Sequence, residues 1–499
     1  MIRAALLVPA VLLSVASTAT AQLISIRTVP VSQAHQFEIF PSRTAPMGGI
    51  SIAVTDSLGD PFTNPAMGAR LASTRFFGSP TAFSVTSDAG GGRTLPAGAL
   101  ARMDAWYGGL WLALQEVDLM PRPDLAGIEP LCLGCEDAGI DLGPAERSQG
   151  NTYAFAMAGR VLPGGISIGG SVLWSRLNAV DGVDLLYAGS ARIDQYGHAL
   201  DVRLGLLKEW ENDRSLEAIV LHNRFGTTHD VFYLDSFWDP ANQRFGQRPR
   251  LEKNLDRTRI WGLHLAYEQA LSAPGWRAGA ILTVNRMDHP KIPNYEIMNI
   301  PRDPGHSSAF NVGLGISRRF SRSTFGVDLV YEPIWSHTWA DAAAPIVAVD
   351  GTTIPAGGMT IENQFRFSNT LLRTGLEQEF AIGGPAAIGG LQLGLAVRGI
   401  HYWLDQHDHV QLSDRSHEER WTEWTPTWGL SLRFPELEIR YRGSQTNGTG
   451  RPGVAPRFGP VFAEDAALSS NILVAPSGPL TLDEVRVMTH QISISLPVH

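Results

Sequence analysis

The sequence contains a serine in a pattern that hydrolases use. Gly165, Ser167 and Gly169 are spaced as G-x-S-x-G, which in hydrolases raises the serine on a sharp turn between a strand and a helix. Here Ser167 stands inside an alternating, strand-like run directly after Pro163 and Gly164. The pattern therefore favours an ordinary strand, and we predict that the chain is not an enzyme.

A second group of residues has the chemistry of metal ligands. Imidazoles and carboxylates suit divalent ions, and carboxylates could also bridge cations on lipopolysaccharide. No H-E-x-x-H pair accompanies them, and polar loops often have this composition. We expect a solvated loop, with no metal site and no cofactor. The group comprises His401, Asp405, His407, Asp408, His409, Asp414, His417 and Glu418.

Cys132 and Cys135 form a C-x-x-C pair and are the two cysteines of the chain. A zinc site would need further ligands, and haem attachment would need a histidine where Glu136 stands. A thioredoxin-like role would need a βαβ context that the sequence lacks. In an exported protein a local disulfide is the simplest interpretation.

The first residues indicate export. Met1 to Arg3 is a short positive region, Ala4 to Val15 is apolar, and Ala19-Thr20-Ala21 has the small residues of a cleavage site. This apolar stretch is too short to span a bilayer. We predict a signal peptide over residues 1–21, removed before Gln22.

Composition excludes several classes of protein. Charged residues make up 18% and apolar residues 44% of the 499 residues, which is too apolar for a disordered chain. After the signal peptide no run reaches the ~18 consecutive apolar residues of a spanning helix. The formal net charge is −9 without a basic block, so we expect no nucleic-acid partner.

From residue 106 onward, apolar and polar residues alternate with period two. This pattern is typical of strands that have two different faces. Connections between the strands alternate between short and long, as in outer-membrane barrels. Fourteen strands are predicted, near 106–117, 151–162, 166–176, 192–210, 215–224, 257–270, 276–289, 308–320, 324–336, 364–381, 390–404, 421–434, 437–443 and 485–498.

The fold class predicted is therefore all-β, a transmembrane antiparallel β-barrel over 106–499 in the bacterial outer membrane. Seven long connections, including those near 225–256 and 405–420, should lie outside and both termini in the periplasm. Aromatic residues near strand ends fit the girdles at membrane surfaces. They are Trp106, Trp111, Trp174, Trp210, Trp276, Trp335, Trp403, Trp421 and Tyr441.

The stretch from Gly49 to Ala66 resembles the N-terminal hatch of the long-chain fatty-acid and aromatic-hydrocarbon transporters, the FadL-like barrels. In that family a small-residue stretch and an acidic pair precede Asn-Pro-Ala and a fourteen-stranded barrel. Asp56, Asp60 and Asn64-Pro65-Ala66 match this order. The chain departs from many barrels in ending Leu496-Pro-Val-His499, without a terminal aromatic.

The resemblance implies that residues 22–105 form a plug, with Asn64, Pro65 and Ala66 buried in the lumen. It also implies a channel for uptake of small hydrophobic compounds through lipid and lipopolysaccharide. Two alternatives stay open. The segment Arg75 to Ser87 could be a further strand, and the barrel could be a structural or adaptor component of a surface or secretion complex. The sequence leaves the substrate and the oligomeric state open.

Charged residues on the polar face of the strands should point into the lumen. A charge facing lipid at the membrane midplane costs about 2–4 kcal/mol. Their mixed signs suggest a salt-bridge network that holds the plug. They are Asp201, Arg203, Glu268, Arg277, Asp328, Glu332, Arg366, Arg398, Arg433, Glu438, Arg440 and Arg442.

Gly169 and Gly170 stand side by side in the third predicted strand. Glycine weakens a strand and often marks a bend. In the family that the chain resembles, an inward kink in an early strand opens the wall sideways. We therefore expect a kink, and a lateral opening, at these two glycines.

Overall fold

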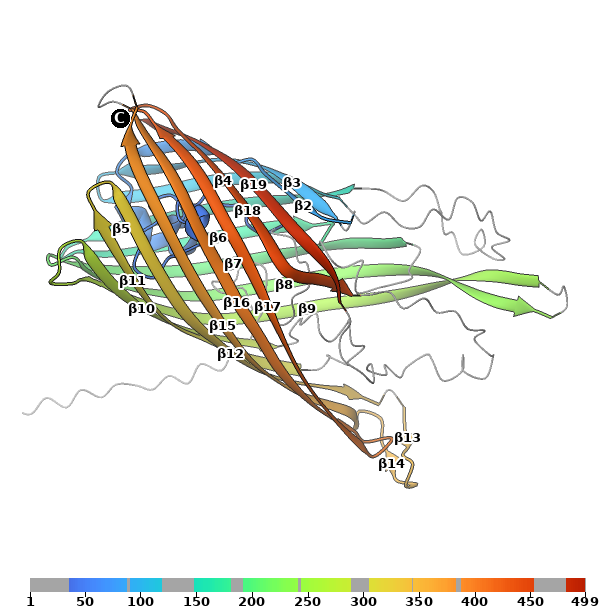
Figure 1. Ribbon diagram of the computed structural model, residues 1–499. Coiled ribbons are helices and arrows are strands. Elements are labelled where there is room, and N and C mark those ends of the chain that lie inside the picture. Colours follow the sequence, from blue (N-terminus) through green and yellow to red (C-terminus); the bar gives the residue numbers. More distant parts are fainter. Residues whose placement is uncertain are drawn as a thin grey trace, which may run out of the picture.

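A closed antiparallel β-barrel forms the protein (Figure 1). The computed structural model describes residues 36–87, 90–118, 148–180, 192–240, 244–288, 305–342, 344–382, 387–452 and 482–498. β1 and β2 both pair with β3, each later wall strand pairs with the next wall strand along the chain, and β19 closes the ring by pairing with β1 and β2. Closure removes the unpaired edges of an open sheet. The predicted barrel is confirmed.

Seventeen strand segments make up the wall. They are β1 (Thr74–Gly78), β2 (Thr81–Val85), β3 (Gly91–Met103), β4 (Trp106–Asp118), β5 (Ser148–Leu162), β6 (Ile166–Leu177), β7 (Arg192–Trp210), β8 (Arg214–Asp239), β9 (Arg244–Ala270), β10 (Trp276–Asp288), β11 (Gly305–Phe320), β12 (Ser323–Asp341), β15 (Met359–Ala381), β16 (Ile388–Asp408), β17 (Ser413–Arg433), β18 (Glu438–Pro452) and β19 (Leu482–Val498). A small hairpin, β13 (Ile346–Val347) and β14 (Thr353–Ile354), lies apart from the wall.

The predicted count of fourteen strands is wrong, because the barrel has sixteen. β1 and β2 share one position between β19 and β3, so the two segments count as one strand. The wall therefore begins at Thr74, and the predicted boundary between residues 105 and 106 falls too late. The alternative of a strand from Arg75 to Ser87 describes this part of the chain.

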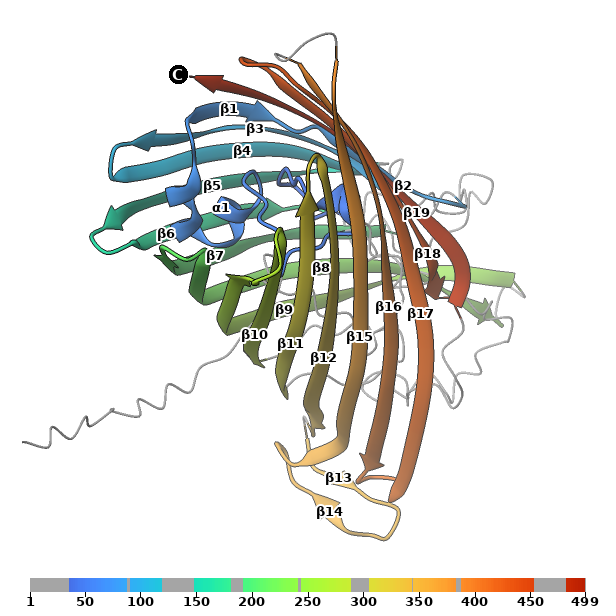
Figure 2. The same cartoon turned by 60° about the vertical axis from the view of Figure 1, so that its left-hand side comes forward.

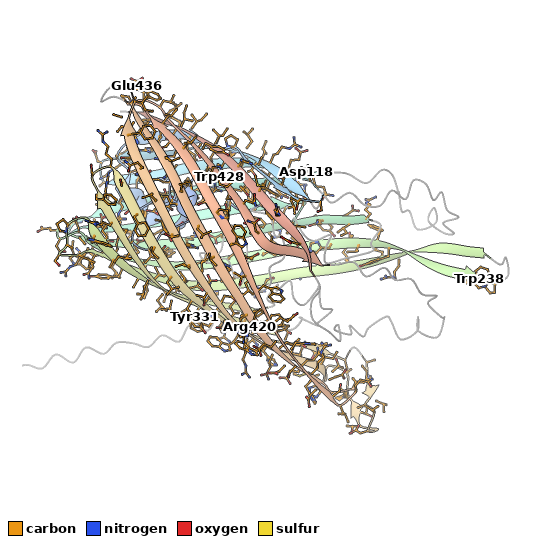
Figure 3. All side chains as sticks on the ribbon, viewed as in Figure 1. Asp118, Trp238, Tyr331, Arg420, Trp428 and Glu436 are labelled. Carbon is orange, nitrogen blue, oxygen red and sulfur yellow. The ribbon has the colours of Figure 1, made fainter. Side chains whose placement is uncertain are left out.

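Two of the predicted long connections are also wrong. β8 and β9 continue as paired strands to Asp239 and Arg244, and β16 and β17 continue to Asp408 and Ser413. The β8–β9 hairpin extends beyond its neighbouring strands, and Trp238 lies near its tip (Figures 1 and 3). β8 and β9 therefore extend far past the membrane-facing part of the wall, at the end of the barrel opposite the short turns.

Side chains alternate between the two faces of the wall. On β4, Leu110, Leu112 and Leu114 are exposed on the outside, whereas Trp111 and Ala113 are buried inside. Exposed leucines at every second position are stable where the outer surface contacts lipid and not water. Among the described residues no helix is long and apolar enough to cross a membrane.

The N-terminal segment, residues 36–73, lies against the inner face of the wall (Figure 2). It contains η1 (Ala45–Met47), α1 (Asp60–Thr63) and η2 (Pro65–Arg70). These elements are too short to be stable alone. Their order therefore depends on contacts with the barrel.

Candidate functional site

Two glycines on neighbouring strands receive the tripeptide Asn64-Pro65-Ala66. Gly169 of β6 and Gly205 of β7 are paired at one level, whereas Gly159, the partner of Gly169 on β5, is covered by the ring of Tyr107. A Cβ atom on Gly169 would lie 2.6 Å from the Pro65 carbonyl oxygen, and one on Gly205 would overlap Asn64 Oδ1. Because these positions lack side chains, the backbone of the segment packs directly on the backbone of the wall.

A row of glycines receives residues 46–53 on the other side of the barrel. A Cβ on any of them would contact the segment within 3.0 Å. At these positions the wall has no side chains and the segment approaches its backbone closely. The row comprises Gly279, Gly315, Gly326, Gly375, Gly394 and Gly429.

The side chain of Asn64 joins the tripeptide to the wall. Its Nδ2 donates to Glu217 Oε2 at 3.0 Å, and its Oδ1 accepts from the Ala66 amide at 3.0 Å. Only 1% of Asn64 is exposed. Pro65 can start η2 because the first amide of a helix needs no partner within it. The sequence motif is therefore a buried helix cap in contact with the barrel.

Asp56 organises the turn that precedes this cap. Its Oδ2 accepts from Ser42 Oγ at 2.6 Å and from the Arg43 amide at 2.7 Å, and its Oδ1 accepts from the amides of Leu58 and Gly59. Asp56 therefore holds residues 42–59 in one conformation.

Burial, with the nearby charge of Asp56, raises the pKa of the Asp60 carboxyl well above its usual value of 3.8. A raised pKa stabilises the docked segment at low pH and loses this contribution as the pH rises through the folded-state pKa. We expect proteolysis within residues 36–73 to increase over that range, and Asp60→Asn to remove the increase. A wild-type rate that is flat with pH would contradict this assignment.

Polar contacts also tie the segment to the wall. Asp328 accepts from the amides of Ser51 and Ile52 at 2.7 and 3.2 Å. Arg203 donates to the Thr63 carbonyl at 3.0 Å and pairs with Asp201 at 2.7 Å. These are buried groups that satisfy one another, which the interior of a barrel requires.

The sequence-predicted lumen charges fall on the inner face with one exception. Arg366 lies on the outer surface, with 59% of its side chain exposed, 4.0 Å from Asp405. Its neighbours Phe365 and Phe367 point inward. In this part of β15 the apolar residues therefore face the lumen and the polar residues face outward. The inward-facing charges are Asp201, Arg203, Glu268, Arg277, Asp328, Glu332, Arg398, Arg433, Glu438, Arg440 and Arg442.

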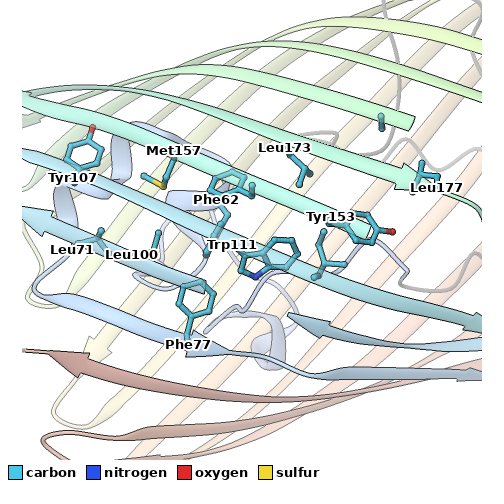
Figure 4. Packing of buried hydrophobic residues seen from close by; sticks show 14 of the residues in the cluster. Phe62, Leu71, Phe77, Leu100, Tyr107, Trp111, Tyr153, Met157, Leu173 and Leu177 are labelled. Carbon is cyan, nitrogen blue, oxygen red and sulfur yellow. The ribbon is translucent and has the colours of Figure 1, made fainter. Parts of the chain in front are cut away.

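Aromatic side chains of the segment and the wall form one cluster (Figure 4). Phe40 stacks on Phe62 with ring centroids 4.5 Å apart, and lies 4.7 Å from Trp111 and 5.5 Å from Phe155. Phe62 also contacts Phe155 and Phe77. We call Phe40, Phe62, Phe77, Trp111 and Phe155 the aromatic box.

Two properties distinguish the aromatic box from an ordinary core. Phe40 is only partly buried, so the box has an accessible side. The indole N–H of Trp111, which is 1% exposed, has no hydrogen-bond partner among the described residues. Tyrosine and tryptophan usually satisfy this group when buried. The box can therefore hold an apolar ring and can also donate one hydrogen bond.

A hydrogen-bond network of uncharged side chains joins the start of the segment to the wall strands that carry Trp111 and Phe155. Gln115 Oε1 accepts from Gln36, Asn151 and Tyr153 at 3.2, 3.0 and 2.8 Å. Gln36 Nε2 also donates to the Ala179 carbonyl at 2.8 Å. These contacts join the start of the segment to β4, β5 and the residues that follow β6.

The wall beside the box is interrupted between β1 and β2. Ser79 and Pro80 separate the two segments, although the register against β3 and β19 is the same on both sides. Pro80 and Pro96, which faces Ser79, have no amide to donate. The Ser79 amide still donates to the Pro96 carbonyl at 3.4 Å, and the Pro80 carbonyl accepts from the Ile492 amide at 3.0 Å. Ser79 Oγ is buried without a partner among the described residues.

An apolar groove of about 560 Å³ lies on the outer surface next to this interruption. Gly78, Ala97 and Ala99 form part of its lining, together with larger apolar side chains such as Phe76 and Leu112. On the opposite face of the same strands lie Phe77 and Trp111 of the box. The wall is therefore thin between the box and the groove.

The other sequence-predicted positions lie as follows. β6 is paired without a register shift through Gly169 and Gly170 on both sides, so no kink occurs there. Ser167 is in the same strand, with no elbow. Cys132 and Cys135 lie outside the described residues. In the described part of the chain no group of three His, Cys, Asp or Glu residues could hold a metal.

No protein-family model matches the sequence, and no curated protein is detectably similar to it. Solved structures to which the chain is similar include a Pseudomonas aeruginosa FadL homologue, with 12% identity and a TM-score of 0.42, covering 95% of this chain and 99% of that one. The Pseudomonas putida toluene transporter TodX has 11% identity and a TM-score of 0.36, covering 91% and 96%. A bacterial polysaccharide outer membrane secretin has 6% identity and a TM-score of 0.38, covering 85% and 98%.

Proposed function

We propose that the protein is an outer-membrane channel through which small hydrophobic compounds enter the cell, with residues 36–73 as a plug in its lumen. The observation that carries the proposal is the aromatic box, which the plug and the wall build together. A channel for polar solutes would need a polar, water-filled interior. Here the plug and an apolar wall surface fill that part of the lumen.

In this proposal Phe40 occupies the place of a ligand. It comes from the plug, is partly exposed, and its ring lies between Phe62, Trp111 and Phe155. Displacement of Phe40 would leave a ring-sized apolar space beside the unpartnered Trp111 N–H. Burying an aromatic ring in such a space contributes roughly 1.5–3 kcal/mol.

The exit that this geometry supports is sideways, through the wall at Ser79 and Pro80. The box and the outer groove face each other across β1 and β3 at this position. Lateral exit would deliver a hydrophobic compound into the membrane and spare it passage through water. Gly169 and Gly170 have no part in this route.

Ligand binding tests the proposal directly. A neutral naphthalene-type fluorophore should bind the purified protein with saturation, and a small aromatic hydrocarbon should compete with it. Phe40→Ala should strengthen binding because the resident ring is removed. Non-saturable partitioning, equal for the wild type and for Phe40→Ala, would contradict a site in the box.

The exit route gives a separate prediction. Replacing Pro80 and Pro96 by valine restores two amide donors, one facing Ile492 of β19 and the other facing Ser79, and should complete the ladders on both sides of this position. We expect uptake of an aromatic compound to slow severalfold while ligand binding and barrel stability stay unchanged. Pro426→Val, at a proline of β17, is the matched control. Equal uptake in the double variant and the control would exclude this exit.

One observation favours the second candidate function, that of a structural or adaptor barrel in a surface or secretion complex. The β8–β9 hairpin projects far beyond the wall, and Trp238 near its tip is 49% exposed. An exposed tryptophan on a projecting hairpin is a typical contact residue for a protein partner. Loss of surface assembly on Trp238→Ala, with no hydrophobic uptake by the wild type, would favour this function.

A further inference from the structure

Cations stack on aromatic rings at three places around the end of the barrel that carries the short turns. Arg160 lies 5.1 Å from the ring of Trp106, Lys208 lies 5.4 Å from Trp210, and Arg318 lies 5.3 Å from Trp276. Each pair is next to a turn that joins neighbouring wall strands, in the sector from β4 to β11. Together they form what we call the cationic rim.

The cationic rim faces outward. Trp106 and Trp210 are 55% and 42% exposed, and they follow the same alternation as the exposed leucines Leu110 and Leu204 on their strands. The rim residues therefore stand at the edge of the outer apolar surface. In a membrane this is the level of the lipid headgroups, where tryptophan and long basic side chains are most stable.

No carboxylate of the described residues lies within ion-pair distance of Arg160, Lys208 or Arg318. Lys208 donates only to the carbonyl of Gly164, in the turn between β5 and β6. Arg93, an exposed cation at the opposite end of the barrel, differs in this respect, because Glu116 and Asp118 lie 3.7 and 3.8 Å from it. The three rim cations are thus not held in ion pairs with other described residues and can contact an anionic group from outside.

We propose that the cationic rim binds the phosphate groups of anionic phospholipids in the leaflet at the short-turn end. The aromatic rings would contact the glycerol and upper acyl region, while each cation contacts a phosphate. A basic side chain near an anionic membrane surface contributes a preference of about fivefold per charge. This inference rests on the membrane location in the proposed function, but not on hydrophobic transport.

Lipid binding to the mature full-length protein tests the inference. The protein would be freed of lipid in detergent, and native mass spectrometry would compare phosphatidylglycerol, phosphatidylcholine and inorganic phosphate. We expect phosphatidylglycerol to be preferred over phosphatidylcholine by at least about fivefold. The variant Arg160→Gln/Lys208→Gln/Arg318→Gln should lose this preference, whereas Arg93→Gln should keep it.

Two controls separate a loss of positive charge from a loss of folding. Arg160→Lys/Arg318→Lys should retain the preference, and the gel mobility of unheated samples shows whether each variant has folded. Equal binding of both lipids, or an unchanged preference in the triple glutamine variant, would overturn the inference. Full competition by inorganic phosphate would show a site for free phosphate and would overturn lipid recognition. Failure to float with vesicles of either lipid would instead contradict the membrane location.

Discussion

Replacing Gly169 and Gly205 by valine should release the N-terminal segment from the wall while the barrel still assembles. A Cβ at either position meets the backbone or the amide side chain of residues 64–66, which cannot move without leaving the wall. Overpacking of this kind typically costs about 1–3 kcal/mol per site. Valine itself favours strands, so the stability of the barrel wall should not decrease. We expect rapid proteolysis within residues 36–73 and a nonselective leak of small polar solutes.

Gly170→Val is the matched control for this experiment. Gly170 is the next residue on β6, but it faces outward, and an added Cβ would lie an ordinary 3.6 Å from Leu204. Protease resistance and permeability should equal those of the wild type. If Gly170→Val released the segment as strongly as Gly169→Val/Gly205→Val, the effect would come from the strand and not from the glycines that receive residues 64–66.

Phe155→Ala should weaken ligand binding and uptake by roughly tenfold or more, because loss of a buried aromatic surface of this size is worth about 1.5–3 kcal/mol in affinity. Phe155 contacts both Phe40 and Phe62 and is 4% exposed. It belongs to the wall, so it should contribute to the box whichever position Phe40 takes. Titration of the naphthalene-type fluorophore and cellular uptake are the two readouts.

Phe367→Ala separates a loss of ligand contacts from a general loss of stability. Phe367 is equally an inward-facing phenylalanine, 2% exposed, but it packs in a different cluster with Phe365 and Tyr402. Truncation at either site should cost about 3–5 kcal/mol of folding stability. Only Phe155→Ala should raise the dissociation constant. Equal weakening by both variants would remove the box from the binding site.

The sequence predicted the barrel well where one face of each strand meets lipid. On β4 exposed leucines alternate with the buried Trp111 and Ala113, because one face of the strand meets lipid and the other meets the lumen. The signal is weaker on β3, where glycines, a threonine and Pro96 fill inward positions and blur the period. It also fails beyond the outer apolar surface. There β9 and β17 are rich in polar residues on both faces, and they resemble loops in sequence.

The candidate site was only partly predictable. Asn64 and Asp56 stand out because a short motif brings them together locally. The alternating pattern of their strands predicts that Trp111 and Phe155 face the lumen. Their contacts with Phe40 and Phe62 depend instead on the path of the segment through the barrel. The partners of Gly169 and Gly205 are likewise distant in sequence. A glycine pair alone therefore suggested a kink, where the structure has a flat contact surface.

Uptake into intact bacterial cells tests the central claim most directly, because lipopolysaccharide bars hydrophobic compounds from crossing unaided. Cells with and without the protein would be compared for a neutral aromatic dye and for a neutral sugar of similar size. The account predicts that the wild-type protein accelerates entry of the dye and leaves entry of the sugar at background. Equal acceleration of both compounds, or no acceleration of the dye, would contradict it.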